Sequence, residues 1–233
     1  MSKLPESKQP ALVQEMFGRI APRYDLMNRL MTGWQDQRWR KFTIQKTRLP
    51  AEGRLLDIGT GTGDLAREAR RQHPGLQLTA ADFTLPMMKV GQRNHPDIRL
   101  DWTAGDSLHL PFAANTFDAV ISGFMLRNLH DLPRGLAEQL RILKPGGRFV
   151  ALDTTQPPQN LLSPVISFYL HTIIPWLGRM VTGQAEAYRY LPATTANFLR
   201  AEKLTAYLAA VGFKKIMYRR FMFGMIAVHW GEK

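Results

Sequence analysis

Residues 54–64, RLLDIGTGTGD, decide the fold of this chain. The stretch opens with a largely apolar run at 54–58, which is typical of a buried strand in a parallel sheet. Three glycines then alternate with other residues as far as Gly63, and a helix-compatible run follows from Asp64. Glycine has no Cβ, so the backbone of such a strand-to-helix turn can lie directly against a ligand. The stretch therefore predicts a ligand-binding turn.

The spacing of these glycines and the acid behind them indicate which ligand fits. A dinucleotide-binding turn reads G-x-G-x-x-G and leaves room for a pyrophosphate at the helix N-terminus. Here the spacing is G-x-G-x-G, and Asp64 stands where an incoming phosphate would be repelled. S-adenosylmethionine, which carries a sulfonium and an ammonium group and no phosphate, suits this turn better. A tight turn that binds no ligand would fit the same glycines. The rest of the chain must show which of these two turns is present.

Composition narrows the class of protein. With 233 residues, 45% of them hydrophobic, the chain can bury a full core. The absence of cysteine excludes a thiolate nucleophile, a disulfide and a cysteine-based zinc site. Its six histidines are scattered, so we expect chemistry without a metal. No apolar run reaches the roughly 18–20 residues of a transmembrane helix, and no signal-type segment leads the chain, so a cytoplasmic location is expected.

The positive charge is concentrated in the two ends of the chain. Of the net charge of +12, residues 1–52 carry +5, residues 53–155 carry +1 and residues 156–233 carry +6. A solvated basic surface, an anionic membrane surface and nucleic acid would each account for these flanks. The charge alone does not distinguish among these three explanations.

Strand and helix patterns alternate regularly from Gly53 onward. Strands are expected at 54–58, 76–82, 98–103, 117–122 and 148–153, and helices at 64–72, 85–94 and 133–143. Lys144-Pro145-Gly146-Gly147 should end the last of these helices and turn the chain. Such alternation predicts a doubly wound parallel sheet whose ligand binds at the carboxyl ends of the strands.

Two further segments lie outside this alternation. Residues 11–49 have helical spacing with breaks at Pro22 and Gly33, and they combine apolar with basic side chains. Residues 161–177 are apolar but are interrupted by prolines, so they are too short and broken to span a bilayer. A core helix, a channel for an apolar tail and an interfacial helix all fit them.

Several acids follow the expected strands. Asp82 ends the second strand, where a carboxylate can accept hydrogen bonds from both hydroxyls of a ribose or can cap the next helix. Asp106 could accept from an adenine amino group, and Ser107 could offer its backbone N–H to the ring. Asp118 is expected to satisfy loop amides.

The motifs resemble a known family. The order LDIGTGTGD, AADFTLPMM, GDSLHLPF, FDAVISGFMLRN and LKPGGR resembles class I S-adenosylmethionine-dependent methyltransferases. The segments MFGRIAPRYDLMNRLMTG, FMLRNLHDLPRGLAEQLRILKPGGR and AYRYLPATTANFL are similar to the quinone C-methyltransferases UbiE and MenG. The resemblance covers roughly residues 16–231. These enzymes methylate the ring of a demethylated, prenylated hydroquinone in menaquinone and ubiquinone synthesis.

The resemblance implies a fold and a domain organisation. It implies an α/β, Rossmann-like, mostly parallel seven-stranded sheet, with the N-terminal and insertion helices forming a substrate cap. Residues 1–50 would be a helical segment facing the substrate or a membrane. Residues 51–233 would be the methyltransferase domain, with a helical insertion at about 158–200.

The resemblance also implies site residues. The residues expected to hold S-adenosylmethionine are Asp57, Gly59, Thr60, Gly61, Thr62, Gly63, Asp82, Phe83, Asp106, Ser107 and Gly123. Those expected to contact the acceptor are Tyr24, Asp25, Asn28, Met125, Asn128 and Tyr190. The candidate catalytic residues are Tyr188, His229, Asp153 and Arg127.

Ring methylation needs a phenolic proton removed, and the sequence leaves the proton acceptor open among Tyr188, His229, Asp25 and Asp153. His229 lies in an expected C-terminal strand and fits a packed core histidine equally well. Arg127 would stabilise a developing phenolate or merely cap a helix.

The chain departs from the family pattern in four places. Residues 58–61 read IGTG where A-C-G-T-G-D is usual, and Met125 replaces the glycine of F-G-L-R-N. Leu152-Asp153-Thr154-Thr155 stands for L-E-F-S, and residues 221–226 read FMFGMI where Thr, Ala and Gly are common. We expect these changes to leave the donor site intact and to affect the preference for headgroup or tail.

The expected partners are a prenylated hydroquinone, most simply demethylmenaquinol, and transiently an anionic membrane surface to which the protein docks peripherally. No nucleic-acid partner is expected, because the chain lacks an RNA-binding module and the N/D-P-P-Y/F loop of amino-methylating enzymes. An RNA methyltransferase and a non-catalytic donor-binding scaffold are the alternatives. The oligomeric state is open, with a homodimer as one option.

Overall fold

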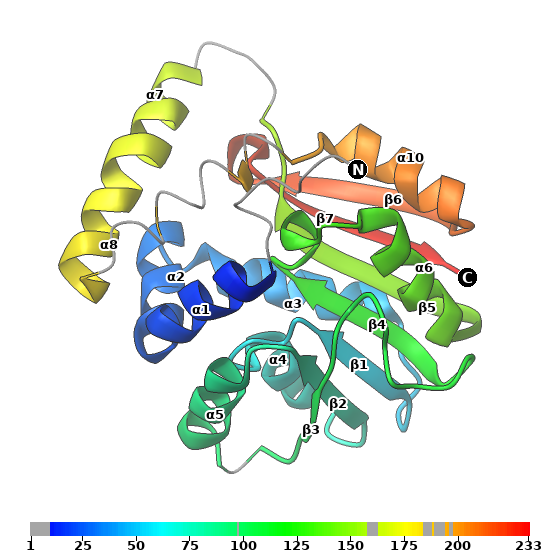
Figure 1. Ribbon diagram of the computed structural model, residues 1–233. Coiled ribbons are helices and arrows are strands. Elements are labelled where there is room, and N and C mark those ends of the chain that lie inside the picture. Colours follow the sequence, from blue (N-terminus) through cyan, green and yellow to red (C-terminus); the bar gives the residue numbers. More distant parts are fainter. Residues whose placement is uncertain (1–9, 97, 158–162, 184–187, 189–193, 196–197) are drawn as a thin grey trace.

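The computed structural model describes residues 10–96, 98–157, 163–183, 188, 194–195 and 198–233 (Figure 1). Seven strands form one sheet in the order β3-β2-β1-β4-β5-β7-β6. Their bounds are β1 Arg54–Ile58, β2 Gln77–Asp82, β3 Asp101–Ala104, β4 Phe117–Gly123, β5 Leu143–Thr154, β6 Lys214–Phe221 and β7 Ile226–Glu232. Strands β1 to β5 are parallel, and β7 runs antiparallel between β5 and β6. The expected doubly wound, mostly parallel sheet is confirmed.

The helices up to residue 142 fall close to where the sequence pattern places them, but no helix was predicted at 201–211. They are α1 Pro10–Ile20, α2 Tyr24–Thr32, α3 Gln35–Thr47, α4 Asp64–Gln72, α5 Leu85–Asn94, α6 Leu132–Ile142, α7 Ser163–Phe168, α8 Ile174–Thr182 and α10 Ala201–Val211. Single 3-10 turns lie at Ala21–Arg23, Leu126–Asn128 and Met222–Gly224. The predicted breaks are confirmed: Pro22 lies in the turn between α1 and α2, and Gly33 ends α2 in a left-handed conformation.

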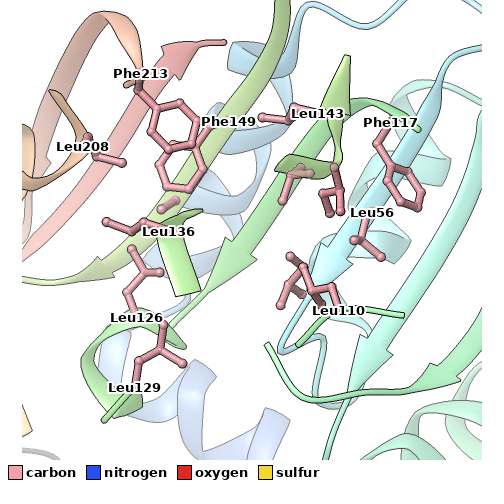
Figure 2. Packing of buried hydrophobic residues seen from close by; sticks show 14 of the residues in the cluster. Leu56, Leu110, Phe117, Leu126, Leu129, Leu136, Leu143, Phe149, Leu208 and Phe213 are labelled. Atoms are coloured by element: carbon pink, nitrogen blue, oxygen red, sulfur yellow. The ribbon is translucent and has the colours of Figure 1, made fainter. Parts of the chain in front are cut away.

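Two apolar layers sandwich the sheet, because successive strand residues point to opposite faces. Leu56, Val120 and Phe149 face one layer, which α6 and α10 complete (Figure 2). Leu55 and Val150 face the other layer, which α3 and α4 complete. Central strands buried on both faces explain why their sequences are continuous apolar runs rather than alternating ones.

Two expected boundaries differ from the structure. The third strand begins at Asp101 rather than 98, because β3 is an edge strand and pairs with β2 only from Thr79 onward. Helix α6 ends at Ile142 and β5 begins at Leu143, so the segment from Lys144 to Gly147 does not itself end the helix; it loops out within β5, whose pairing with β4 shifts register there.

The expected N-terminal segment 1–50 is divided between two places. Trp39 and Ile44 of α3 are buried in the core beneath the sheet, so α3 belongs to the main body. Helices α1 and α2 lie beyond the carboxyl ends of the central strands (Figure 1). Helix α8 packs on α2 through a separate apolar cluster that includes Met27, Met31 and Ile174. The cap over the sheet edge is therefore α1, α2 and α7–α8.

Helix α5 supports the glycine turn from behind. A Cβ on Gly91 of α5 would lie 2.5 Å from the Thr62 carbonyl oxygen and 2.7 Å from the Trp102 ring. Glycine in a helix interior normally costs stability relative to alanine. Here it is required, because the helix and the backbone of the turn approach too closely for a side chain.

We therefore expect Gly91→Ala to destabilise the fold by about 1–3 kcal/mol, since an added methyl must displace backbone. The matched control is Gly18→Ala in α1, where a Cβ would meet only Pro86 at 3.5 Å, an ordinary contact. That variant should be neutral or should stabilise by about 0.5–1 kcal/mol. Urea unfolding of both variants checks this; equal effects at the two glycines would contradict the proposed packing.

Candidate active site

The glycine turn after β1 adopts a backbone that only glycine readily accepts. Gly59, Gly61 and Gly63 have φ of +65°, +59° and +85°. The amides of Gly59 and Thr60 donate to the Ala81 carbonyl at 2.8 and 3.1 Å, which fixes the turn against the end of β2. The predicted tight, open-backbone turn is therefore present at the carboxyl edge of the sheet.

Asp57 holds a buried carboxylate beneath this turn. Its Oδ2 accepts from the Thr60 hydroxyl at 2.7 Å and from the Ala66 amide at 3.2 Å, whereas its Oδ1 has no partner among the described residues. Burial raises the pKa of Asp57 to about 7, against the opposing effect of those two hydrogen bonds. A cationic group placed near Oδ1 would stabilise the ionised form.

Asp82 joins β2 to the glycine turn. One carboxylate oxygen accepts from the Gly61 amide and the other from the Thr84 amide, each at 2.7 Å. Burial raises the pKa of Asp82, and these backbone hydrogen bonds oppose the rise. The carboxylate also lines the neighbouring cavity, so the two roles considered for this acid, loop acceptor and ligand contact, are compatible.

A large cavity opens in front of the turn. Its empty space, counted with the part open to solvent, is about 1050 Å³. The expected donor residues Gly59, Gly61, Asp82, Phe83, Asp106, Ser107 and Gly123 line it, together with Met125 and Asn128, which were expected at the acceptor. We call it the donor cavity. A side chain on Gly59 would meet Met125 Cγ at 2.5 Å, so Met125 occupies the space that this glycine leaves free.

A second cavity, of about 830 Å³, lies between the sheet edge and the cap helices. Its wall is mainly apolar and includes Met16, Ile20, Met31, Trp39, Leu170, Ile174, Met222 and Met225. Within this wall Arg127, Thr154 and Thr195 each have a buried polar atom, Nε or Oγ1, without a hydrogen-bond partner in the described part of the chain. We call it the acceptor cavity.

A third, smaller cavity of about 310 Å³ lies behind the glycine turn. It is lined by charged and hydroxyl side chains, namely Arg40, Asp57, Thr60, Thr62 and Asp64. Only Tyr24 and Phe124, among the described residues, line all three cavities. The three spaces therefore meet at this aromatic pair.

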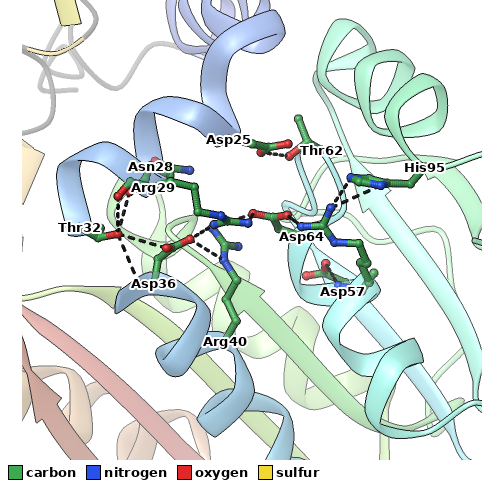
Figure 3. Close-up of polar contacts among 12 residues, drawn as sticks. Asp25, Asn28, Arg29, Thr32, Asp36, Arg40, Asp57, Thr62, Asp64 and His95 are labelled. Atoms are coloured by element: carbon green, nitrogen blue, oxygen red, sulfur yellow. Dashed lines mark hydrogen bonds and ion pairs between the residues drawn. The ribbon is translucent and has the colours of Figure 1, made fainter. Parts of the chain in front are cut away.

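A buried ionic cluster attaches the cap helices to the turn (Figure 3). Asp36 of α3 accepts from Arg29 and from Arg40 Nε at 3.3 Å. Asp64, the first residue of α4, pairs with the same two arginines at 3.0 and 3.1 Å and with Arg67. Burial acts to raise the pKa of Asp64, but the three guanidinium groups outweigh it and hold that pKa below its usual range.

This cluster corrects two expectations. Asp64 was expected to repel phosphate from the turn, yet its charge is neutralised by arginines. Arg40 was counted with the basic flanks, yet it is only 7% exposed and paired with two acids. Part of the N-terminal positive charge is therefore internal and does not contribute to a basic surface.

The candidate catalytic residues Arg127 and Asp153 form one unit. Arg127 Nη1 lies 2.7 Å from Asp153 Oδ1, and the Arg127 amide donates to Asp153 Oδ2 at 3.2 Å. Asp153 also accepts from the Thr154 amide at 2.7 Å. With both oxygens occupied, Asp153 orients the arginine at the cavity wall and is poorly placed to accept a proton.

His229 and Asp25 lie elsewhere. His229 is buried under α10, stacked on Tyr218, with Nε2 3.0 Å from the Ala201 carbonyl oxygen, and it lines none of the three cavities. Burial lowers its pKa to about 4, which fits a packed core histidine. Asp25 accepts from the Thr62 hydroxyl at 2.6 Å and also lines none of them. Both were proton-acceptor candidates, and neither position favours that role.

The remaining acceptor candidates are aromatic or amide side chains. Tyr24, Asn28 and Tyr188 line the acceptor cavity. Burial, together with the neighbouring Tyr24, raises the pKa of the Tyr188 phenol, so this phenol stays protonated at neutral pH. Tyr190 lies outside the described residues.

Four residues of the site were missed from the sequence: Arg40, Phe124, Thr154 and Thr195. The signal for Phe124 was its place at the end of β4, where a ligand-binding strand end was expected. Thr154 lies in one of the four departures from the family pattern, whereas Thr195 carries no signal in the sequence, because its burial depends on how the cap closes over the sheet.

Comparisons with known proteins agree with this geometry. The model of the ubiE/COQ5 methyltransferase family matches residues 1–233. The chain is 46% identical over 227 residues to the ubiquinone/menaquinone biosynthesis C-methyltransferase UbiE of Desulfotalea psychrophila, covering 97% of this chain and 92% of that protein. It is 39% identical over 220 residues to the demethylmenaquinone methyltransferase of Thermus thermophilus, covering 94% of this chain and all of that protein.

A solved structure supports the fold independently. A possible histamine N-methyltransferase of Thermotoga maritima, described as S-adenosylmethionine-dependent, superposes with a TM-score of 0.64 at 18% identity, over 94% of this chain and 99% of that one. At this identity the likeness concerns the fold alone. The match of the family model across all 233 residues agrees with this fold, with the glycine turn and with the acids at the strand ends. The chain is therefore an S-adenosylmethionine-dependent methyltransferase and belongs to the ubiE/COQ5 methyltransferase family.

Proposed function

We propose that the protein methylates a ring carbon of a prenylated hydroquinone in quinone biosynthesis, with demethylmenaquinol as the favoured acceptor. Relatives that cover nearly the whole chain carry the names UbiE and demethylmenaquinone methyltransferase. The observation that carries the proposal is the acceptor cavity, an apolar space that adjoins the donor cavity and contains a few buried polar atoms without partners.

The residues around the turn fit S-adenosylmethionine. The Oδ1 of Asp57 is a buried carboxylate oxygen to which no group in the described part of the chain donates, which suits the cationic methionine end of this donor. Asp82, Asp106 and Ser107 line the donor cavity at the ends of the next two strands, where they would hold the ribose and the adenine. When bound, S-adenosylmethionine supplies an electrophilic methyl group on a positively charged sulfur.

The acceptor cavity fits an apolar ring that carries oxygen substituents. Arg127 Nε and the hydroxyls of Thr154 and Thr195 would donate to the oxygens of a hydroquinone, which satisfies buried groups that otherwise lack partners. As the acceptor phenol loses its proton, the Arg127 guanidinium, held by Asp153, would stabilise the resulting negative charge. The protonated Tyr188 phenol would donate a hydrogen bond rather than accept a proton.

A methylation assay with labelled S-adenosylmethionine tests the proposal. Demethylmenaquinol and the prenylated methoxy-benzoquinol precursor are run side by side, and we expect label in the naphthoquinol. Asp82→Ala serves as the negative control, because it removes the tie between β2 and Gly61. Label in neither quinol, with donor binding intact by calorimetry, would overturn the assignment of the acceptor.

Donor binding should depend on pH through Asp57. Its carboxyl is neutral below about pH 7 and ionised above it, and only the ionised form attracts a cationic donor. We therefore expect the affinity for S-adenosylmethionine to rise from about pH 5 to about pH 7, approaching tenfold per pH unit at the acid end. Titration calorimetry measures it. Asp57→Asn should bind weakly with a flat profile; a flat profile in the unaltered protein would contradict this role.

We propose further that the outer face of α7–α8 docks on an anionic bilayer. Val165, Phe168, Trp176 and Met180 recur at helical spacing on that face and are 57% to 66% exposed. The inner side of this segment carries Ile174 of α8 and Leu170 of the π-helical turn Tyr169–Ile173, which joins α7 to α8, toward the acceptor cavity. A helix that is apolar on both sides fits a position between a core and a lipid surface. No helix among the described residues is long and apolar enough to cross a membrane.

Flotation with phosphatidylglycerol vesicles at low salt tests this surface. The unaltered protein should float with the vesicles and release at high salt, because basic residues contribute about 1 kcal/mol each near an anionic surface. A Phe168→Glu and Trp176→Glu variant should stay in solution. The matched control is Met217→Glu, an equally exposed apolar side chain on β6. The docking proposal would be contradicted if the unaltered protein did not float, or if both variants lost flotation equally.

A further inference from the structure

Phe124 occupies the junction of the three cavities. It directly follows β4, is half-buried and lines the donor cavity, the acceptor cavity and the small charged cavity. In a methyltransferase the reacting sulfur must lie where the donor meets the acceptor. The junction at Phe124 also borders the small charged cavity that Asp57 lines. The donor cavity, the acceptor cavity and the cavity of Asp57 therefore all adjoin this one point.

The backbone of Phe124 is held in a conformation that side chains rarely adopt. Its φ is +59°, a value normally left to glycine. Its amide donates to the Leu152 carbonyl at 2.7 Å, and its carbonyl accepts from Asn128 Nδ2 at 3.1 Å. Strained residues fixed by their surroundings in this way cluster at functional sites.

Both chain neighbours of Phe124 are anchored in spaces that only glycine allows. A Cβ on Gly123 would lie 2.7 Å from Leu65 Cδ1, so the strand end packs tightly on α4. Met125 fills the space in front of Gly59, where a Cβ would come within 2.5 Å of its Cγ. The backbone at Phe124 is therefore fixed from both sides, and its side chain packs against the apolar layer that includes Leu65 while it borders all three cavities.

We propose that the Phe124 ring binds the positively charged sulfur of the donor. Aromatic faces attract cations, and the attraction is strongest where water is excluded. The ring already has one cation near it, because Arg127 Cζ lies 5.4 Å from its centroid. Asp153 pairs with that guanidinium at 2.7 Å, which offsets part of its repulsion of a second positive charge. This inference requires that S-adenosylmethionine is the donor, and it does not depend on which acceptor is methylated.

The test compares two ligands that differ in charge at sulfur. S-adenosylmethionine has a sulfonium, and S-adenosylhomocysteine has a neutral thioether in the same scaffold. Calorimetry on Phe124→Leu should show S-adenosylmethionine binding weakened about 5- to 30-fold, the size of a desolvated cation–π contact. S-adenosylhomocysteine should change less than about twofold, because Leu keeps the apolar bulk and the same backbone strain.

Two further variants separate this role from a purely structural one. Phe124→Tyr retains an aromatic face and should restore the preference for the charged ligand. Phe17→Leu alters an aromatic side chain that lines the donor and acceptor cavities but not the third, and it should leave the ratio of the two affinities unchanged. Equal weakening of both ligands in Phe124→Leu would overturn the proposal. Because the assay contains no quinol, its outcome is independent of whether either quinol is methylated.

Discussion

The ion pairs that Asp64 makes with Arg29 and Arg40 hold this molecule together at its functional edge. The glycine turn starts α4 at Asp64, and the two arginines come from α2 and α3. Removing one partner of such a buried pair leaves an uncompensated charge, which is far more costly than the pair is stabilising. The position of the glycine turn therefore depends on the position of the cap, and the position of the cap depends on the turn.

The cap determines which chemistry is possible, because it covers the open carboxyl edge of the sheet and so forms connected cavities there. The sheet alone provides the turn, Asp57 and Asp82, which suit the donor. The acceptor cavity needs α1, α2, α8 and the turn Tyr169–Ile173 before α8 as its outer wall. Arg127 is buried in the wall of this cavity, so its charge acts in a medium where electrostatic effects are larger than in bulk solvent.

Local strain and close packing are concentrated around the same edge. Gly91 forgoes helix stability so that α5 can support the turn, and Phe124 is held at a positive φ between two tightly packed neighbours. Positive φ also occurs away from this edge, at Arg48, Asn115 and Lys215, but the strand expected at 54–58 and the helix expected at 64–72 lie where their local patterns predict. Departures from local preference at a ligand site are typical where function constrains the backbone.

The sequence by itself determined the sheet, the glycine turn and the acids at the strand ends, because apolar runs and glycine spacing act over a few residues. It also identified Arg127 and Asp153 but not that they pair with each other. Only the tertiary structure decided that His229 lies under α10, that Arg40 is internal, and that Thr154 and Thr195 line one cavity. Those facts depend on contacts between segments far apart in the chain, and no local pattern encodes which side chain such a contact will bury.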